Sequence, residues 1–592
     1  MIVAMGTTSF CLIHTPLINQ QSTNLDVLSS TMKSRSGFIV SLSRGNNEKV
    51  QKRRITSKRT HVDSRKSLGE ILFDTLDRAI VKFIDPPLQS SVNPNYVLCD
   101  NFRPVDELSP IECDIIHGSS SILSCLEGVY IRIGPNPQFT PNGPHHYFDG
   151  NGMMQSIRFS QGRATFCCRY VKTNKYLFEH QAGSYIIPNI IGGMQDLGPF
   201  IARAALFAAR CILGQYDYSQ GFGVANTSIV HFGGRVYALC ESDLPYEIKV
   251  KNDGDIITLG RHDSNGNLTL NMTTHPKVDP ETKEAFAFRY WATYPYMTYF
   301  RFDANGDKQP DVPIFSMKQS SLTHDMAITQ KYAIIFDIQL GADPMNFIRG
   351  RRLVSFDPTK VPKIGILPRL ATNESGIKWF DAPGLNVLHV VNAWDEIDDD
   401  GSEVVVLVAS NILQVEHLME QIHMIEPCME IVTIHFRTGV VSRKSMSTNN
   451  FELPVINQAY VAKKNRYFYS VINEKRPLKS SMVRTLGVVK LDITASSENN
   501  TKDRNKHIVA SRMYGENCFG GEPYFVARDP DDPNSEEDDG YVVSYVHDES
   551  SGKSKFVAMD ARSPSLEIVV EVKLPQRVPY GLHGIFIREN DL

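Results

Sequence analysis

Short apolar or alternating runs separated by tight-turn residues recur along most of this chain, and they constrain its fold more than any other feature. The runs at 228–232 and 235–239 flank Gly233-Gly234, a two-residue connection typical of a β-hairpin. Further runs lie at 156–160, 163–171, 332–340, 403–409, 431–436, 466–472, 541–546, 555–561 and 566–572. So many hairpins over about 500 residues predict a closed all-β architecture, and a seven-bladed β-propeller fits the length.

The length of 592 residues is compatible with several domains or with one large propeller. No linker composition follows residue 90, so we predict a single domain over residues 91–592. Two acidic stretches, 395–403 and 529–539, contain Gly or Pro and are typical of surface loops. The first resembles a calcium-binding loop only loosely, because its acids do not fall at alternate positions ending in a glutamate.

The first 65 residues differ in composition from the rest. They are rich in serine and in basic residues, and Asp26, Glu48 and Asp63 are their only acids. This composition predicts a disordered organelle transit peptide. Two other readings stay open, a plain disordered tail and a nuclear signal in KRRITSKR (52–59).

Two segments have the pattern of amphipathic helices. The first is an amphipathic N-terminal helix within residues 66–90. Apolar side chains recur there at helical spacing from Ser67 to Ile84, with acids and Arg78 between them, and Asp85-Pro86-Pro87 ends the helix. Residues 199–213 are apolar except for Arg203 and Arg210, which lie seven apart and share a face. Basic residues on an apolar helix suit insertion into one leaflet of a membrane, and the alternative is packing on the protein core. No apolar run reaches the roughly 18 to 20 residues that span a bilayer.

Charge and cysteine content exclude some classes of function. The net charge of −4 and the pI near 6.5 give no cationic field, so nucleic acid is not an expected partner. The ten cysteines include no CxxC pair. This favours reduced thiols over a disulfide framework.

Four of the 17 histidines share a local context: each begins or ends a predicted strand and is bordered by small or turn residues. They are His275, His324, His389 and His583. In a propeller the inner strands of different blades converge on the axis, so residues far apart in the chain can share one metal ion. Imidazole suits iron, zinc, copper and nickel. The alternative is that each is a structural histidine at a strand end.

From about Phe83 to Leu592 the chain resembles the plant carotenoid cleavage dioxygenases, most of all the plastid-located fourth class. The resemblance rests on blocks such as EGVYIRIGPNPQF, GPHHYFDGNGMMQSIRFSQGRATF, HPKVDPETKEAFAFRY, HDMAIT, VNAWDE, CFGGEPYFVARDP and VKLPQRVPYGLHG. It implies a seven-bladed propeller with helical loops capping one face. It also implies an Fe(II) ion held by His275, His324, His389 and His583, with Glu241, Glu452 and Glu522 behind these ligands. A carboxylate there fixes the tautomer of a metal-bound imidazole.

The resemblance further implies the reaction and its setting. The expected activity is cleavage by O₂ of a conjugated C=C bond in a carotenoid or apocarotenoid, at the 9,10 or 9′,10′ position, giving two carbonyl products. The expected location is a plastid (chloroplast or chromoplast), in peripheral contact with its membrane or with plastoglobules. The alternatives are 11,12 cleavage of an epoxycarotenoid, a non-catalytic carotenoid or lipid-globule binding protein, and a propeller hydrolase, for which no G-x-S-x-G motif is present.

The chain departs from the family pattern near the expected substrate tunnel. Leu388 and Leu582 precede two of the ligands, and Met326 follows a third, at places where many relatives carry phenylalanine. Smaller or softer side chains at these places predict a wider tunnel near the metal. The departures leave the ligands intact and bear on which carotenoid and which bond are used.

Overall fold

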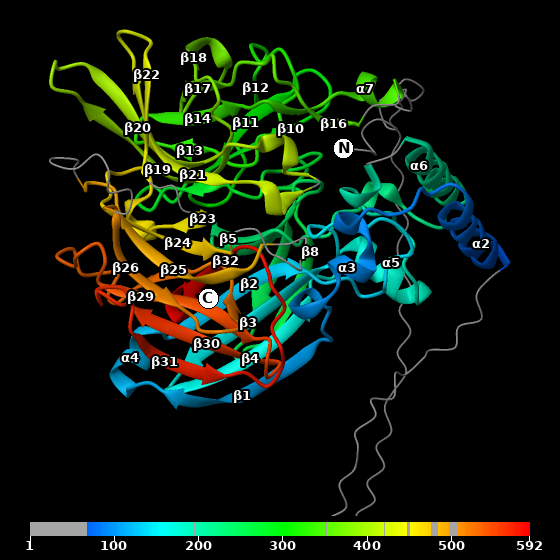
Figure 1. Ribbon diagram of the computed structural model, residues 1–592, viewed down its shortest axis with the longest axis horizontal. Coiled ribbons are helices and arrows are strands. Elements are labelled where there is room, and N and C mark those ends of the chain that lie inside the picture. Colours follow the sequence, from blue (N-terminus) through cyan, green and yellow to red (C-terminus); the bar gives the residue numbers. More distant parts are fainter. Residues whose placement is uncertain are drawn as a thin grey trace, which may run out of the picture. The chain divides into compact units, whose positions relative to one another are not determined.

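A computed structural model describes residues 68–194, 197–349, 352–419, 421–446, 450–474, 483–495 and 506–592 (Figure 1). The chain divides into two units, Met1–Ile71 and Leu72–Leu592, and the second contains every described strand. The transit peptide expected over residues 1–65 lies outside the described residues.

Four antiparallel sheets of four strands each occupy the middle of the sequence. They consist of β5 (Ser228–Phe232), β6 (Arg235–Leu239), β7 (Tyr246–Val250) and β8 (Ile256–Arg261); β9 (Lys277–Val278), β10 (Ala285–Tyr290), β11 (Met297–Phe302) and β12 (Val312–Pro313); β13 (Ala327–Ile328), β14 (Tyr332–Asp337), β17 (Lys363–Pro368) and β18 (Lys378–Asp381); and β19 (Val387–Ile397), β20 (Glu403–Ile412), β21 (Pro427–His435) and β22 (Val441–Ser445). A separate pair is formed by β15 (Leu340–Ala342) and β16 (Val354–Phe356).

The β5–β6 hairpin has the bounds that the sequence predicts, and its turn explains why. Gly233 and Gly234 both adopt positive φ, 57° and 67°. A two-residue turn of this type matches the twist of the flanking strands, and only residues that tolerate positive φ form it readily.

A fourteen-stranded sheet joins the two ends of the sequence. Its members are β1 (Leu108–His117), β2 (Gly128–Pro135), β3 (Gly152–Ser160), β4 (Arg163–Tyr170), β23 (Phe451–Val455), β24 (Tyr467–Asn473), β25 (Thr485–Asp492), β26 (Ile508–Met513), β27 (Cys518–Gly520), β28 (Tyr524–Ala527), β29 (Gly540–Asp548), β30 (Lys553–Asp560), β31 (Ile568–Lys573) and β32 (Gly584–Arg588). The last strand, β32, pairs with β2, and β31 pairs with β1, as Figure 1 shows. The C-terminal strand is therefore held between segments from the start of the domain.

Apolar side chains pack between neighbouring sheets. Phe232 and Phe302, from the β5–β8 and β9–β12 sheets, have ring centroids 4.9 Å apart within one buried cluster. Ile366 of β17 and Leu407 of β20 share another, with at most 1% of either residue exposed. Burial of each such side chain contributes about 1.5–3 kcal/mol to stability. The prediction of a mainly β fold is confirmed, but no sheet of the described residues closes on itself.

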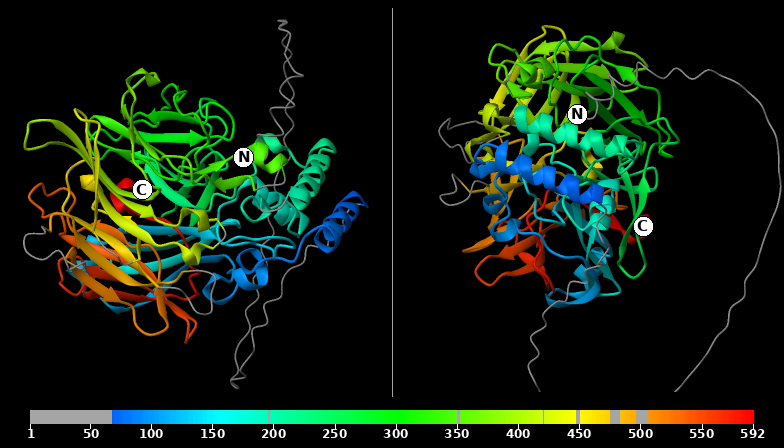
Figure 2. Two further views of the ribbon diagram at one scale, coloured as in Figure 1. Left: turned by 45° about the horizontal axis from the view of Figure 1, so that its top comes forward. Right: turned by 90° about the vertical axis from the view of Figure 1, so that its right-hand side faces the viewer.

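Most of the helices gather at one edge of the sheets, where α2 and α6 lie side by side, whereas α4 lies at another edge, beside β31 (Figures 1 and 2). The helices are α2 (Leu68–Phe83), α3 (Pro94–Val97), α4 (Ser120–Cys125), α5 (Asn174–Ala182), α6 (Leu197–Ile212) and α7 (Pro344–Ile348). The helical patterns at 67–84 and 199–213 coincide with α2 and α6. Within the described residues, no helix is both long and apolar enough to cross a bilayer.

The arginines of α6 point into the protein and not to the outer face of the helix. The side chains of Arg203 and Arg210 are only 8% and 3% exposed. Arg203 Nη1 donates to Asp85 Oδ1 at 2.6 Å, and Arg210 Nη2 lies 3.7 Å from Asp74 Oδ1 of α2. A buried guanidinium needs an anionic partner, and α2 with the residues that follow it supplies two. The outer face of α6 is left apolar.

Candidate metal centre

The four histidines singled out in the sequence come from four separate segments, each at the start of a strand. His275 lies two residues before β9, His324 three residues before β13, and His583 directly before β32. His389 is the third residue of β19, where the pairing register with β20 shifts. A strand start directs the side chain towards the same end of each sheet, which allows distant segments to meet there.

The structure brings these four side chains together. One ring nitrogen of each lies within 4.8 Å of the others, and the Nε2 atoms of His275 and His324 are 2.9 Å apart. Two nitrogens bound to one ion at about 2.1 Å and at right angles would lie about 3 Å apart. The His389 Nε2 atom is buried and has no hydrogen-bond partner among the described residues. The arrangement fits a metal ion bound by four imidazole nitrogens.

A carboxylate lies behind three of the four rings. The Nδ1 atom of His324 is 2.6 Å from Glu241 Oε1, that of His389 is 2.6 Å from Glu452 Oε2, and that of His583 is 2.7 Å from Glu522 Oε1. A carboxylate only accepts hydrogen bonds, so each Nδ1 carries the proton and each Nε2 lone pair is free for a metal. His275 differs, since no carboxylate of the described residues contacts its ring.

The electrostatics of the cluster favour a bound cation. Burial, together with the three facing imidazoles, holds the pKa of His275 well below its ordinary value, so its ring is neutral. Burial opposes protonation of His324, but the Glu241 carboxylate outweighs it and raises the pKa of His324. Burial alone would raise the pKa of Glu452. The charge of His389 and its hydrogen bond to this carboxylate outweigh burial, so the pKa of Glu452 is lowered. The Glu452 carboxylate therefore stays anionic next to the position of a dication.

The three glutamates are held by further contacts. Glu241 Oε2 accepts from the hydroxyl of the half-buried Tyr290 at 2.6 Å, and Glu522 Oε2 accepts from the Gly584 backbone N–H at 3.0 Å. Glu452 accepts from the backbone N–H of Leu453, which has a φ of +51°. A leucine in this region is strained by roughly 1–3 kcal/mol. Tyr290 and Leu453 carry no local sequence signal that would single them out.

A buried arginine packs against the segments that carry Glu522 and His583. Arg132 is 1% exposed, its Nη2 atom donates to Pro579 O at 2.5 Å, and its guanidinium lies 5.1 Å from the Tyr545 ring centroid. It fills the space next to Gly521, which precedes Glu522, and Gly581, which is two residues before His583. A Cβ on Gly581 would lie 2.8 Å from Arg132 Nε, and one on Gly521 would overlap Nη1.

Gly521→Ala is therefore expected to destabilise the protein by about 1–3 kcal/mol, because the new methyl group must displace a fully buried guanidinium. Thermal unfolding and metal content of the purified variant measure the effect. Gly198→Ala is the matched control, since a Cβ there meets no atom within 4 Å. Equal melting temperatures for the two variants would contradict the steric role of Arg132.

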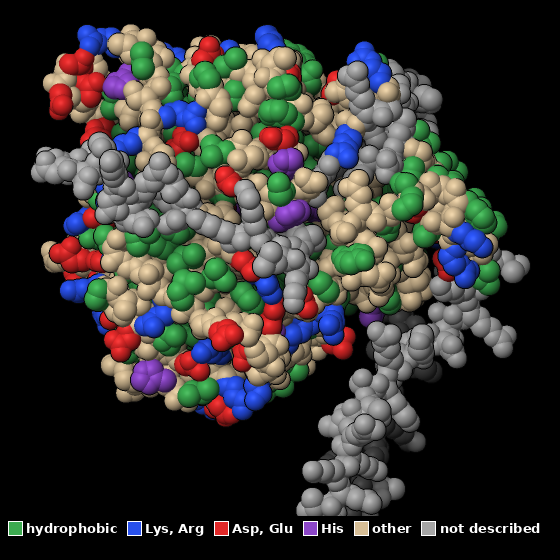
Figure 3. Space-filling view, viewed as in Figure 1, with side chains coloured by type: hydrophobic (Ala, Val, Ile, Leu, Met, Phe, Trp, Pro, Cys, Tyr) green, Lys and Arg blue, Asp and Glu red, His purple; other side chains and the backbone are tan. Residues whose placement is uncertain are grey.

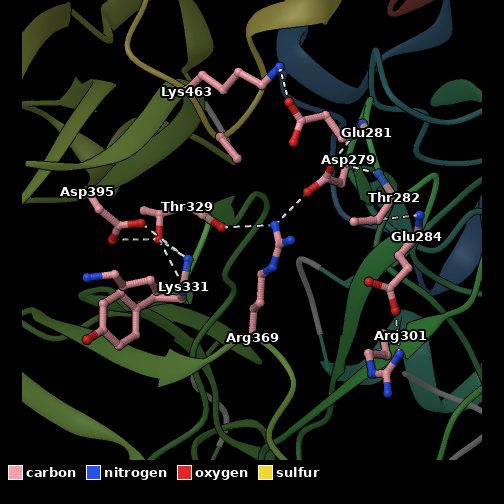
Figure 4. Close-up of polar contacts among 12 residues, drawn as sticks. Asp279, Glu281, Thr282, Glu284, Arg301, Thr329, Lys331, Arg369, Asp395 and Lys463 are labelled. Carbon is pink, nitrogen blue, oxygen red and sulfur yellow. Dashed lines mark hydrogen bonds and ion pairs between the residues drawn. The ribbon is translucent and has the colours of Figure 1, made fainter.

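A second polar network joins the far ends of three ligand-bearing segments (Figure 4). Asp279, Thr329 and Asp395 follow His275, His324 and His389 by four, five and six residues, roughly 13–20 Å along an extended chain. Figure 4 shows Arg369 between two of them: its Nη1 is 2.6 Å from Asp279 Oδ2 and donates to Thr329 O at 3.2 Å.

Thr329 continues this network, because its Oγ1 donates to Asp395 Oδ1 at 2.9 Å. The Asp279 side chain is fully buried and that of Arg369 is 8% exposed. The pair thus stays desolvated, and loss of either partner would leave a buried charge. The network ties together the ends of these segments that lie away from the histidines.

The three residues expected to shape the tunnel lie in different surroundings. Leu388 and Leu582 are half-buried next to His389 and His583. Met326 has 0% exposure and belongs to a core cluster with Phe288 and Tyr299. Met326 therefore packs between sheets, on the same side of the chain as Ile328 of that cluster, and its effect on a tunnel stays a prediction.

Comparison with known proteins places these features in a family. The family model described as "Retinal pigment epithelial membrane protein" matches residues 102–588, a range that includes all four histidines and the three glutamates. The chain is 50% identical over 531 residues to "Probable carotenoid cleavage dioxygenase 4, chloroplastic" of Arabidopsis thaliana, covering 89% of this chain and 86% of that protein. It is 48% identical over 535 residues to "9-cis-epoxycarotenoid dioxygenase NCED1, chloroplastic" of Oryza sativa subsp. japonica, covering 89% and 81%.

Two solved structures show the same β-propeller fold. The lignostilbene dioxygenase of Pseudomonas brassicacearum aligns with a TM-score of 0.69 and 20% identity, over 84% of this chain and 98% of that one. The cobalt-substituted Synechocystis ACO aligns with a TM-score of 0.67 and 22% identity, over 84% and 100%. The family model that matches residues 102–588 and the two relatives of 50% and 48% identity show that the chain belongs to the carotenoid oxygenase family.

Proposed function

We propose that this protein is an Fe(II)-dependent dioxygenase that cleaves a conjugated C=C bond of a carotenoid or apocarotenoid, at the 9,10 or 9′,10′ position. The observation that carries the proposal is the convergence of His275, His324, His389 and His583, three of them backed by carboxylates. The relative with 50% identity is named a carotenoid cleavage dioxygenase. A protein that only bound carotenoids would gain nothing from four clustered imidazoles.

Fe(II) fits this donor set. Four neutral imidazoles fill four of the six positions of an octahedral ion and leave two for small molecules. When bound there, Fe(II) would supply an electron-rich centre for dioxygen. In the overall reaction each alkene carbon gains one oxygen atom, so O₂ is the only oxidant and no organic cofactor is needed.

The residues of the chain have distinct tasks in this proposal. The four histidines hold the metal, and Glu241, Glu452 and Glu522 keep three of the rings in the tautomer with a free Nε2. Tyr290 holds the carboxylate of Glu241 through its hydroxyl. No acid–base pair is assigned, because the balanced reaction transfers no proton between substrate and protein.

We infer that the propeller has seven blades in a single domain over residues 91–592. The four separate sheets supply four blades, and the fourteen-stranded sheet contains three further units: β23 to β26, β28 to β31, and β32 with β2, β3 and β4. The last of these combines the C-terminal strand with N-terminal strands. The helices α2, α5 and α6 would then cap one face, with α2 as the amphipathic helix expected over residues 66–90.

We further propose a peripheral contact between this edge and a plastid membrane or plastoglobule. Leu72, Leu76 and Phe83 of α2 are 58%, 43% and 75% exposed, and Ile201 and Ile212 of α6 are 55% and 77% exposed. Figure 3 shows hydrophobic side chains over these helices, with basic side chains beside them. The chloroplastic names of the relatives and the basic, serine-rich first 65 residues support delivery to a plastid.

Replacing Ile201 and Ile212 together by serine is expected to weaken binding to liposomes of plastid lipids by about 10- to 100-fold. Each isoleucine contributes up to about 1.5–3 kcal/mol on burial, and 1.4 kcal/mol corresponds to tenfold. Liposome flotation measures the effect. Leu259→Ser is the matched control, because the exposure of Leu259, 53%, is close to the 55% of Ile201, but Leu259 lies on β8. Equal losses in both variants would remove α6 from the membrane contact.

Expression in bacteria that accumulate carotenoids, with chromatography and mass spectrometry of the products, tests the activity. Carbon 9 carries a methyl group, so 9,10 cleavage gives a ketone and an aldehyde. Cleavage at 11,12 gives two aldehydes. We expect this second outcome if the protein shares the activity of the epoxycarotenoid dioxygenase to which it is 48% identical. Pigment that remains intact with iron-loaded protein and oxygen present would refute the enzymatic proposal.

A further inference from the structure

One buried carboxylate in the centre has no task in the proposed function. Asp325 directly follows His324, and its side chain is 2% exposed. Its Oδ1 atom lies 2.8 Å from Lys277 Nζ and accepts from the Met326 backbone N–H at 2.7 Å. Its Oδ2 atom accepts from the Val390 backbone N–H at 2.7 Å. Both oxygens are therefore engaged.

Each of the two distant partners of Asp325 lies next to another histidine of the cluster. Lys277 is two residues after His275, and Val390 directly follows His389. These segments belong to three different sheets, those of β9, β13 and β19, which share no backbone pairing. A single side chain thus connects three of the four imidazole-bearing segments at the level of the imidazoles.

We propose that Asp325 is a positioning residue that sets the mutual distances of His275, His324 and His389, and thereby the geometry of the metal site. The proposal rests on the proposed function in that the cluster must bind a metal. It assigns to Asp325 no contact with the metal or the substrate.

The need for such a tether follows from the layout of the three segments. The network of Arg369, Asp279 and Thr329 joins them at their far ends, four to six residues beyond the histidines. A small rotation of one sheet about that network would move its histidine relative to the others. Asp325 opposes this motion next to the histidines, because the residues that it joins lie only one or two positions from His275, His324 and His389 in the chain.

A carboxylate suits this role better than a neutral side chain. It offers acceptors on both oxygens, whereas the isosteric amide of asparagine has one acceptor and one donor group. The amide would direct an N–H at Val390 N or at the pair formed by Met326 N and Lys277. Lys277 balances the buried negative charge, and charge-assisted bonds of this kind are stronger than neutral ones.

Titration of metal-free protein with Co(II) alone tests the proposal, since the visible absorption of Co(II) reports both affinity and coordination geometry. Asp325→Asn is expected to weaken Co(II) binding by about 10- to 100-fold, the loss seen when a residue supporting a ligand is removed, and to change the absorption spectrum. Asp492→Asn is the matched control. Asp492 is also buried, pairs with Arg466 and accepts from the Thr494 backbone N–H, but contacts none of the histidine segments.

A charge effect is separated from a positioning effect by Lys277→Met. On its own, this substitution removes a cation near the metal, so a purely electrostatic role predicts tighter binding. The double variant Lys277→Met/Asp325→Asn restores the net charge. Positioning predicts that the double variant keeps the weak binding and altered spectrum of Asp325→Asn, whereas wild-type behaviour of the double variant would overturn the proposal.

Two further outcomes are decisive. Wild-type protein that binds no metal would overturn the proposed function and this inference together, whereas an Asp325→Asn variant with wild-type affinity and spectrum would overturn the inference alone.

Asp325→Glu is the second variant: it keeps the charge but displaces the carboxylate, and we expect the same altered spectrum. Failure of both Asp325 variants to fold, with Asp492→Asn folded, would make Asp325 a residue of the fold and refute the specific role.

Discussion

Replacing His324 or His583 by alanine is expected to abolish metal retention and activity while the β-sheets remain folded. Each ring contributes one nitrogen to a set in which all four lie within 4.8 Å of one another. Loss of a ligand removes a metal bond outright, so the affinity should fall by more than the roughly 10- to 100-fold caused by loss of a residue behind a ligand.

The fold should survive because the histidines are not what holds the sheets together. His583 precedes β32, whose pairing with β2 runs through backbone hydrogen bonds from Gly584 to Arg588. The variants do leave a carboxylate without its partner, Glu241 or Glu522. Glu522 keeps the Gly584 N–H, which limits the cost. We therefore expect a modest drop in melting temperature.

Metal content after dialysis, far-UV circular dichroism and turnover together check this result. His231→Ala is the matched control, because His231 lies in the β5 hairpin strand and outside the cluster. Iron content and turnover at the wild-type level in both His324→Ala and His583→Ala would refute the assignment of these residues as ligands.

Glu522→Gln is expected to retain part of the metal and to lose most of the turnover. The Glu522 carboxylate accepts from His583 Nδ1 through one oxygen and from Gly584 N through the other. Glutamine has a single acceptor oxygen, so one of these donors would face an N–H group. The His583 ring then loses its orientation and its added basicity, and activity or metal affinity should fall by about 10- to 100-fold.

Steady-state kinetics on samples of known iron content separate the two effects. We expect kcat per iron to fall while KM changes little, because Glu522 does not contact the substrate in this proposal. Glu430→Gln is the matched control: Glu430 of β21 pairs with Arg443 of β22, and its side chain is 8% exposed against 7% for Glu522. Kinetics of Glu522→Gln that match those of the control would remove Glu522 from the metal centre.

The local elements of this protein could be predicted from its sequence. The Gly233-Gly234 turn specifies a hairpin because it needs positive φ at both residues, and the structure places β5 and β6 at the predicted bounds. The helices α2 and α6 also appear within a few residues of their predicted limits. These features depend on neighbours in the chain, which a sequence pattern records directly.

Other features were invisible at that level. Arg203 and Arg210 share a helix face as predicted, and only the structure shows that this face points to Asp85 and Asp74. The inner strands β9 and β13 are only two residues long, so they have no detectable periodicity. Asp325, Tyr290 and Arg132 act on segments tens to hundreds of residues away, and no local motif marks them.

The sequence by itself determined the β-rich character of the chain, its hairpins and amphipathic helices, and, through family resemblance, the four histidines and three glutamates. Only the tertiary structure decided which glutamate lies behind which histidine, that β32 pairs with β2, and that Asp325 joins three ligand segments. The physical reason is range: turns and helical faces arise from residues close in the chain, whereas a metal centre at the meeting point of separate sheets exists only after those sheets have packed.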